Sequence, residues 1–187
     1  MEINKKIAFY ASCLFGYLCI GLSIFVSVEV VMRKVFTKSL QGADELGGYV
    51  LAIGSTLAFC IALIGNNHIR IDIFHYKFPD KMQAVLNWLA KLSMLFISFL
   101  LAFAAVGVLQ ETMSYGSSAP TPWATPLHYP QIPWTTGLII FFGLSCYYLI
   151  NATWLLITRR WNDLRVLYQP KGSADEVKEE LLDLEHR

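Results

Sequence analysis

The chain has 187 residues, of which 55% are hydrophobic and 16% charged, and its mean hydropathy is +0.46. This composition is typical of a membrane protein, because a water-soluble domain of the same size carries more charge. The formal net charge of +1 excludes the large basic surface on which nucleic-acid binding depends. The charges are also unevenly placed, since residues 112–158 contain no Asp, Glu, Lys or Arg. We therefore expect an integral membrane protein with no nucleic-acid partner.

Four apolar stretches are long enough to cross a bilayer as helices. A helix rises about 1.5 Å per residue, so about 20 residues cover the roughly 30 Å hydrocarbon core. The predicted spans are about 7–32, 46–65, 88–110 and 134–158. The first is too long for the apolar core of a cleaved signal peptide, so we interpret it as an uncleaved anchor. The predicted fold class is an all-α integral membrane protein with four transmembrane helices.

Basic residues near the ends of the spans predict the orientation, because cytoplasmic loops keep an excess of Lys and Arg. One side of the membrane would carry Lys5, Lys6, Arg70, Lys77, Lys81, Arg159, Arg160 and Arg165. The other side would carry Arg33, Lys34 and Lys38. We therefore expect both termini in the cytoplasm, a membrane domain over residues 1–160 and an acidic cytoplasmic tail over 161–187. Lys91, near the start of the third span, is expected to extend its ammonium to the lipid headgroups.

The predicted external connection between the third and fourth spans is rich in proline. Residues 111–133 contain five of the seven prolines, and repeated proline argues against a long helix there. The interleaved aromatic residues are typical of the membrane interface. A docking surface for another protein is the alternative interpretation. The candidate docking residues are Pro122, Trp123, Pro126 and Pro130.

Glu29 and Arg33 form a candidate ion pair at the external end of the first span. They are four residues apart, so their side chains share one face of a helix. An ionisable group inside a span is a functional candidate, because an unpaired charge in lipid costs at least about 2–3 kcal/mol. Glu29 lies near the boundary and has Arg33 as a partner. We therefore favour a structural or headgroup role over proton coupling.

Signatures of catalysis, haem and metal sites do not emerge from the sequence. The cysteines at 13, 19, 60 and 146 lie inside predicted spans and form no CxxC pair. The histidines at 68, 75, 128 and 186 lie outside the spans, where they cannot clamp a buried haem. A phosphate-binding Gly-rich loop and a nucleophile with its base are also missing. We predict no enzyme, no cofactor and no metal site.

The second span has a distinct pattern. Asp44 and Glu45 precede it, where carboxylates complement the positive end of a helix dipole. Small residues allow another helix to approach closely, and they are Gly47, Gly48, Ala52, Ser55, Thr56, Ala58 and Ala62. The span is followed by His68-Ile69-Arg70-Ile71-Asp72, in which Arg70 is a candidate ligand for a lipid phosphate.

At these residues the chain resembles the small membrane subunit of tripartite ATP-independent periplasmic (TRAP) transporters, the DctQ-like proteins. The resemblance runs from about Ala8 to Ile157 and is most specific at Asp44-Glu45 and at His68 to Asp72. It is supported by Arg33 with Phe36, Thr125-Pro126, Pro130 and Gly137. Family members often have Pro-Gly entering the fourth span, where this chain has Thr136-Gly137. Family-motif residues with possible partner or lipid contacts are Arg33, Glu45, His68, Arg70 and Asp72.

The resemblance implies a non-catalytic scaffold subunit in a bacterial inner membrane. Such a subunit pairs with a large permease subunit (M type), which holds the sodium and substrate sites and moves its transport domain like an elevator. A periplasmic substrate-binding protein (P type) delivers an organic acid, of the C4-dicarboxylate or sialic-acid type. Membrane lipids are further partners. Two alternatives remain: a stand-alone proton-coupled exporter that uses Glu29, and a membrane anchor for an oxidoreductase.

Overall fold

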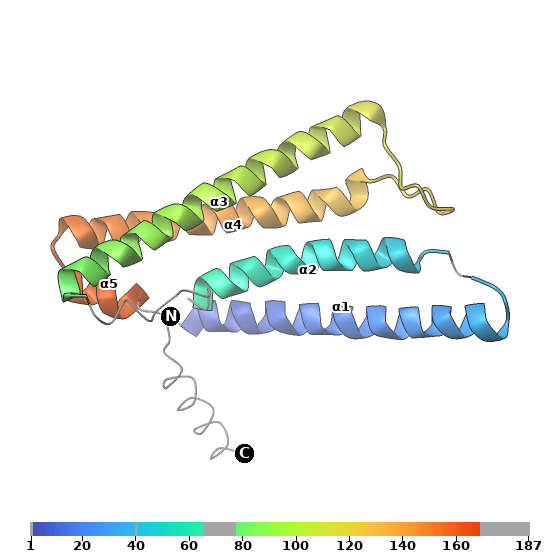
Figure 1. Ribbon diagram of the computed structural model, residues 1–187, viewed down its shortest axis with the longest axis horizontal. Coiled ribbons are helices and arrows are strands. Elements are labelled where there is room, and N and C mark those ends of the chain that lie inside the picture. Colours follow the sequence, from blue (N-terminus) through green and yellow to red (C-terminus); the bar gives the residue numbers. More distant parts are fainter. Residues whose placement is uncertain (1, 40, 66–77, 169–187) are drawn as a thin grey trace, which may run out of the picture. The chain divides into compact units, whose positions relative to one another are not determined.

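The regular structure is helical throughout the described residues, which are 2–39, 41–65 and 78–168 of the computed structural model. The helices are α1 (Glu2–Val35), α2 (Ala43–Gly65), α3 (Asp80–Tyr115), α4 (His128–Ile157) and α5 (Trp161–Tyr168), as shown in Figure 1. The first four are long and apolar enough to cross a membrane. The predicted all-α, four-span fold is therefore confirmed.

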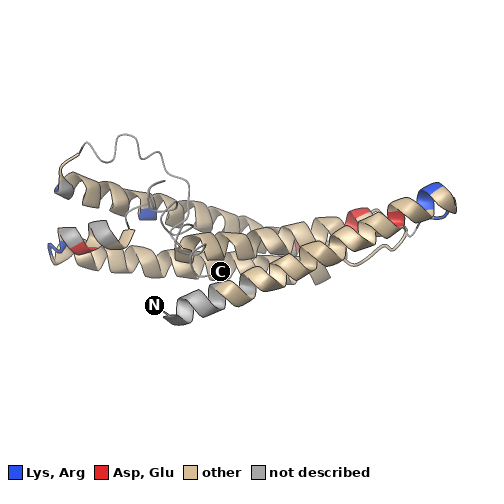
Figure 2. Ribbon diagram, turned by 90° about the horizontal axis from the view of Figure 1, so that it is seen from below, with Lys and Arg blue, Asp and Glu red and all other residues tan. Residues whose placement is uncertain are grey.

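Charged positions lie mainly toward the helix ends, and long uncharged stretches separate them (Figure 2). All four long helices begin before the expected spans, and α3 extends furthest, with 36 residues. At about 1.5 Å per residue α3 is roughly 54 Å long, which exceeds the roughly 30 Å hydrocarbon core. Parts of this helix therefore lie outside the hydrocarbon.

The expectation that proline argues against a long helix over residues 111–133 is met by residues 116–127, which are not helical, but helices extend into both ends of that segment. The helix α3 continues to Tyr115, and α4 begins at His128 and contains Pro130 and Pro133. Pro130 falls in the first turn, where a backbone N–H has no partner within the helix. Pro133 lies further in and removes one backbone hydrogen bond, a loss that α4 tolerates.

The chain divides into two compact units, of which the first contains residues 1–61 and 98–143. Small residues of α2 bring its neighbours close in this unit. Gly54 lies beneath the Phe15 ring of α1, and Gly137 of α4 lies against the Thr56 side chain. Aromatic contacts join Phe59 to Phe141 and Phe99 to Phe142, with ring centroids 5.7 and 5.8 Å apart. The small residues of α2 therefore contact two helices, although Ala58 is exposed.

The second unit contains residues 62–97 and 144–187 and includes the buried Lys91. Its ammonium is 5.2 Å from the ring centroid of Tyr148 and 4.9 Å from that of Tyr168. Lys91 is only 2% exposed. The expectation that it extends to the headgroups is therefore wrong, because two aromatic faces stabilise the cation inside the protein.

The short helix α5 packs through one face against α3 and α4. Its Leu164 and Tyr168 are buried together with Ala84 and Ala152. Burial raises the pKa of Tyr168 to about 12. The helix α5 was not predicted from the sequence, although Trp161, Leu164 and Tyr168 follow the i, i+3, i+7 spacing of an amphipathic helix.

The contact between α2 and α4 predicts that Gly137→Ala is destabilising. The new Cβ would overlap the Thr56 side chain, whose Cβ is only 2.8 Å away. Overpacking of this kind costs about 1–3 kcal/mol, and each kcal/mol lowers the Tm by about 2–4 °C in a chain of this size. Thermal unfolding of the purified protein measures the change.

Gly143→Ala is the matched control on the same helix. Gly143 is exposed, and a Cβ there meets no described heavy atom within 4 Å. Because alanine favours helix over glycine by about 1 kcal/mol, this variant is expected to keep or raise the Tm. Equal losses in the two variants would contradict the proposed packing role of Gly137.

The packing of α5 predicts that Tyr168→Ala releases this helix. Loss of a large buried aromatic side chain costs about 3 kcal/mol, which corresponds to roughly 100-fold faster amide exchange in the segment that it holds. Hydrogen exchange over Trp161–Tyr168 measures the effect. Leu167→Ala is the control because Leu167 is 46% exposed, and a similar rise in both variants would argue against the role of Tyr168.

Candidate functional site

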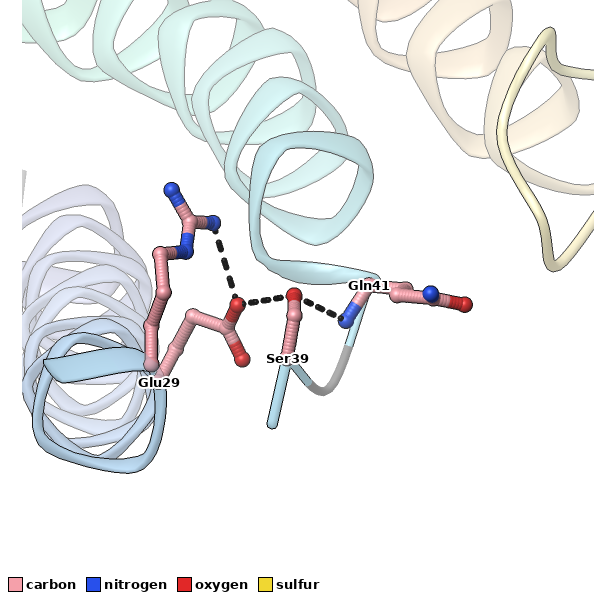
Figure 3. Close-up of polar contacts among 4 residues, drawn as sticks. Glu29, Ser39 and Gln41 are labelled. Carbon is pink, nitrogen blue, oxygen red and sulfur yellow. Dashed lines mark hydrogen bonds and ion pairs between the residues drawn. The ribbon is translucent and has the colours of Figure 1, made fainter. Parts of the chain in front are cut away.

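Glu29 connects the end of α1 to the chain that leads into α2 (Figure 3). Its Oε1 accepts hydrogen bonds from Arg33 Nη2 at 3.1 Å and from Ser39 Oγ at 2.5 Å. Ser39 Oγ in turn accepts the backbone N–H of Gln41 at 3.1 Å. The carboxylate therefore fixes the connection between the two helices from one side.

Glu29 and its hydrogen-bond partners differ in burial, which affects how much each contributes to the stability of the connection between α1 and α2. Glu29 is 2% exposed, whereas the Arg33 side chain is 64% exposed. An ion pair with so exposed a partner contributes at most about 1 kcal/mol. Ser39 is exposed as well, so the shared element of both bonds is the buried carboxylate, which is costly to leave without a donor.

The connection between α3 and α4 is an ordered hairpin rather than an irregular loop. The N–H groups of Ala119 and Leu127 bond to the carbonyls of Thr125 and Ser117, at 2.9 and 3.0 Å. A turn closes at its tip, where the Ala124 N–H bonds to the Thr121 carbonyl at 2.9 Å. Proline at the second position of that turn, Pro122, has the φ angle that the turn requires. We call residues 116–127 the α3–α4 hairpin.

Glu45 attaches the α3–α4 hairpin to the first turn of α2. Its carboxylate accepts hydrogen bonds from the hydroxyl of Tyr49, at 2.8 Å, and from the hydroxyl of Thr121. Thr125 adds a further side-chain hydrogen bond. Glu45 is only 7% exposed as a result.

A second contact lies beside the first. The indole ring of Trp123 packs on Gly42, where a Cβ would overlap the ring. Glycine is therefore required for this close approach. Trp123 remains 47% exposed. The tip of the hairpin is thus anchored on both sides of Pro122, by Thr121 on Glu45 and by Trp123 on Gly42.

The other predicted site residues fall in different places. Pro122 and Pro126 are exposed on the α3–α4 hairpin, and Pro126 pairs with Ser118 in an isolated bridge. Pro130 is half-buried in the first turn of α4. The motif residues His68, Arg70 and Asp72 lie outside the described residues.

Sequence reasoning missed the partners of the two buried carboxylates. Thr121 is 76 residues from Glu45, and Ser39 is a single serine in a short connection. A lone hydroxyl residue carries no periodic signal, so its pairing cannot be inferred from one sequence. Gly42 next to the acidic pair is the only local hint that something approaches the start of α2.

Groups of three or more His, Cys, Asp or Glu that could hold a metal ion do not occur among the described residues. Both buried carboxylates are engaged as hydrogen-bond acceptors. What the α3–α4 hairpin presents to its surroundings is Trp123, with exposed prolines on either side.

Four apolar helices able to span a membrane, with charged residues mainly toward their ends, define a multi-pass helical membrane protein. The family model of the DctQ component of tripartite ATP-independent periplasmic transporters matches residues 22–159, and the chain belongs to this family. It is also similar to a protein of Haemophilus influenzae named as a TRAP transporter small permease protein. The two are 25% identical over 101 residues, which cover 52% of this chain and 63% of that protein.

Family membership confirms the resemblance inferred from the sequence and identifies a transporter component. The alignment spans less than two thirds of the relative's own length.

The geometry around Glu29 predicts a measurable loss of stability in Glu29→Gln. The substitution keeps the shape of the side chain but weakens two charge-assisted hydrogen bonds, at a cost of about 1–2 kcal/mol. We expect a lower Tm and faster amide exchange in the residues that follow α1. Glu111→Gln, at an exposed position of α3, is the control. Wild-type exchange in the Glu29 variant would contradict the assigned role.

Proposed function

We infer that this chain is the non-catalytic scaffold subunit of a sodium-coupled, binding-protein-dependent transporter for organic acids. The large M-type permease subunit would hold the sodium and substrate sites and move as an elevator, while this chain supports its static part. A P-type binding protein would deliver a substrate of the C4-dicarboxylate or sialic-acid type. The complex would lie in the bacterial inner membrane, with both termini of this chain in the cytoplasm.

The observation that carries this proposal is that the buried charged side chains are occupied within the chain. Among the described residues these are Glu29, Glu45 and Lys91. Glu29 and Glu45 accept hydrogen bonds from neighbouring side chains, and Lys91 lies over two tyrosine rings. A transporter that works alone needs polar groups near the midplane that can exchange partners with a solute. Glu29, Glu45 and Lys91 already have partners within the chain, which does not favour a role in binding a solute.

The surface of α1 supports the assignment as a subunit. Only 6% of the apolar spanning stretch of α1 is buried inside the structure, against 17–22% of the corresponding stretch in the other three helices. Such a helix is covered by lipid or by another membrane protein, and a large permease subunit offers a matching apolar surface. Arg33, Glu45, His68, Arg70 and Asp72 are proposed to contribute to partner or lipid contacts, Glu45 through the α3–α4 hairpin.

The α3–α4 hairpin is the proposed docking site for the P-type binding protein. Its exposed Trp123 and the rigid prolines at 122 and 126 offer a surface that loses little conformational entropy on binding. Pro130 would fix the direction in which the chain enters α4. This arrangement requires that the hairpin face the periplasm, as the distribution of Lys and Arg predicts.

The proposal predicts that the purified chain transports nothing by itself. In vesicles with an imposed sodium gradient, we expect no accumulation of labelled succinate or sialic acid. When the chain is co-expressed with the large permease subunit, the two are expected to purify together. Uptake by that complex is expected to require both sodium and the loaded binding protein.

Glu29→Gln separates this proposal from a stand-alone exporter. A scaffold carrying this substitution retains uptake in the assembled complex, with a loss limited to stability or yield. Accumulation by the isolated chain that is abolished in Glu29→Gln would instead establish proton-coupled export. A haem or flavin absorption band in the purified protein would indicate an oxidoreductase anchor.

A further inference from the structure

Glu45 is held differently from what helix capping requires. A carboxylate in the first turn of a helix complements the helix dipole even when it is exposed to solvent. Asp44, its neighbour in the same turn, is exposed and already supplies such a charge. Glu45, in contrast, is 7% exposed and accepts hydrogen bonds from the α3–α4 hairpin. Its burial indicates a function that Asp44 does not share.

The hairpin's internal hydrogen bonds shape it without fixing its position. The backbone bonds from Ala119 to Thr125, Leu127 to Ser117 and Ala124 to Thr121 all lie within residues 116–127. They would persist if the hairpin swung as a unit. Attachment to α2 comes instead from the Thr121 and Thr125 hydroxyls on Glu45 and from the Trp123 ring on Gly42.

We propose that Glu45 is the positioning residue of the α3–α4 hairpin, which it locks onto α2 so that Trp123 is presented in one fixed orientation. Gly42 adds a second contact, because its lack of a side chain allows the indole ring to pack next to the helix. The carboxylate orients a recognition surface and does not itself bind a solute or an ion. A soluble partner then meets an ordered tip and loses less entropy on docking. The consequence for docking rests on the proposed function, whereas the positioning itself does not.

Fluorine NMR of 5-fluorotryptophan tests the positioning directly in the full chain in lipid nanodiscs. The five tryptophans each give a signal, and Trp123→Phe identifies the one from Trp123. In Glu45→Ala and Thr121→Val we expect that signal to move toward the position of free 5-fluorotryptophan and to gain solvent sensitivity. The other four signals should stay in place and report an intact fold.

Two control variants separate positioning from general effects. Asp44→Ala removes a charge from the same helical turn without touching the hairpin. Tyr49→Phe removes a Glu45 hydrogen bond that lies within α2. Both are expected to leave the Trp123 signal unchanged. If Glu45→Ala shifts all five signals because the chain unfolds, Thr121→Val decides, and an unmoved Trp123 signal in that variant overturns the proposal.

Uptake by the assembled complex then tests whether the orientation matters for docking. In Thr121→Val we expect the concentration of binding protein for half-maximal uptake to rise about fivefold, as for loss of one buried hydrogen bond, with an unchanged maximal rate. A shifted Trp123 signal with normal uptake would uphold the positioning and refute the docking role of the hairpin. An unmoved signal would refute the positioning whatever the uptake.

Discussion

The structure depends on the rule that a polar group inside a membrane needs a partner from the protein itself. No water reaches the hydrocarbon, so an unpaired group costs several kcal/mol. Helices satisfy their own backbones, and several hydroxyls in the spans bond to carbonyls one turn back, as Ser23 and Ser27 do to Cys19 and Ser23. Lys91 follows the same rule through two aromatic faces. These serines and Lys91 therefore serve cohesion within and between helices.

The same requirement gives the carboxylates at the helix ends a structural use. Glu29 accepts a hydrogen bond from Ser39 in the connection before α2. Glu45 accepts one from Thr121, which lies far along the chain. Each buried acid gathers hydroxyl donors from an adjoining loop, because a carboxylate accepts several hydrogen bonds and donates none. The two acids thus attach these loops to the helices, whereas backbone hydrogen bonds shape the α3–α4 hairpin itself.

The sequence sufficed for the four spans because their length and lack of charge are imposed by the bilayer. It also placed Glu29 and Arg33 on one helix face, where the structure has them 3.1 Å apart. It failed where tertiary contacts decide. The partners of Lys91 lie on α4 and α5, and the partner of Glu45 on the α3–α4 hairpin. Pro130 and Pro133 were read as breakers of structure, although position within a helix decides whether proline is tolerated.

The length of α3 has a consequence for what can reach the α3–α4 hairpin. Transmembrane helices rarely tilt by more than about 40°, and a helix of roughly 54 Å tilted that far still covers about 41 Å along the bilayer normal. It therefore overshoots the hydrocarbon by about 10 Å or more, and its C-terminal end carries polar Gln110, Glu111 and Thr112. When the part of α3 that extends beyond the hydrocarbon is this C-terminal end, Trp123 lies outside the acyl chains. Soluble macromolecules can then reach it.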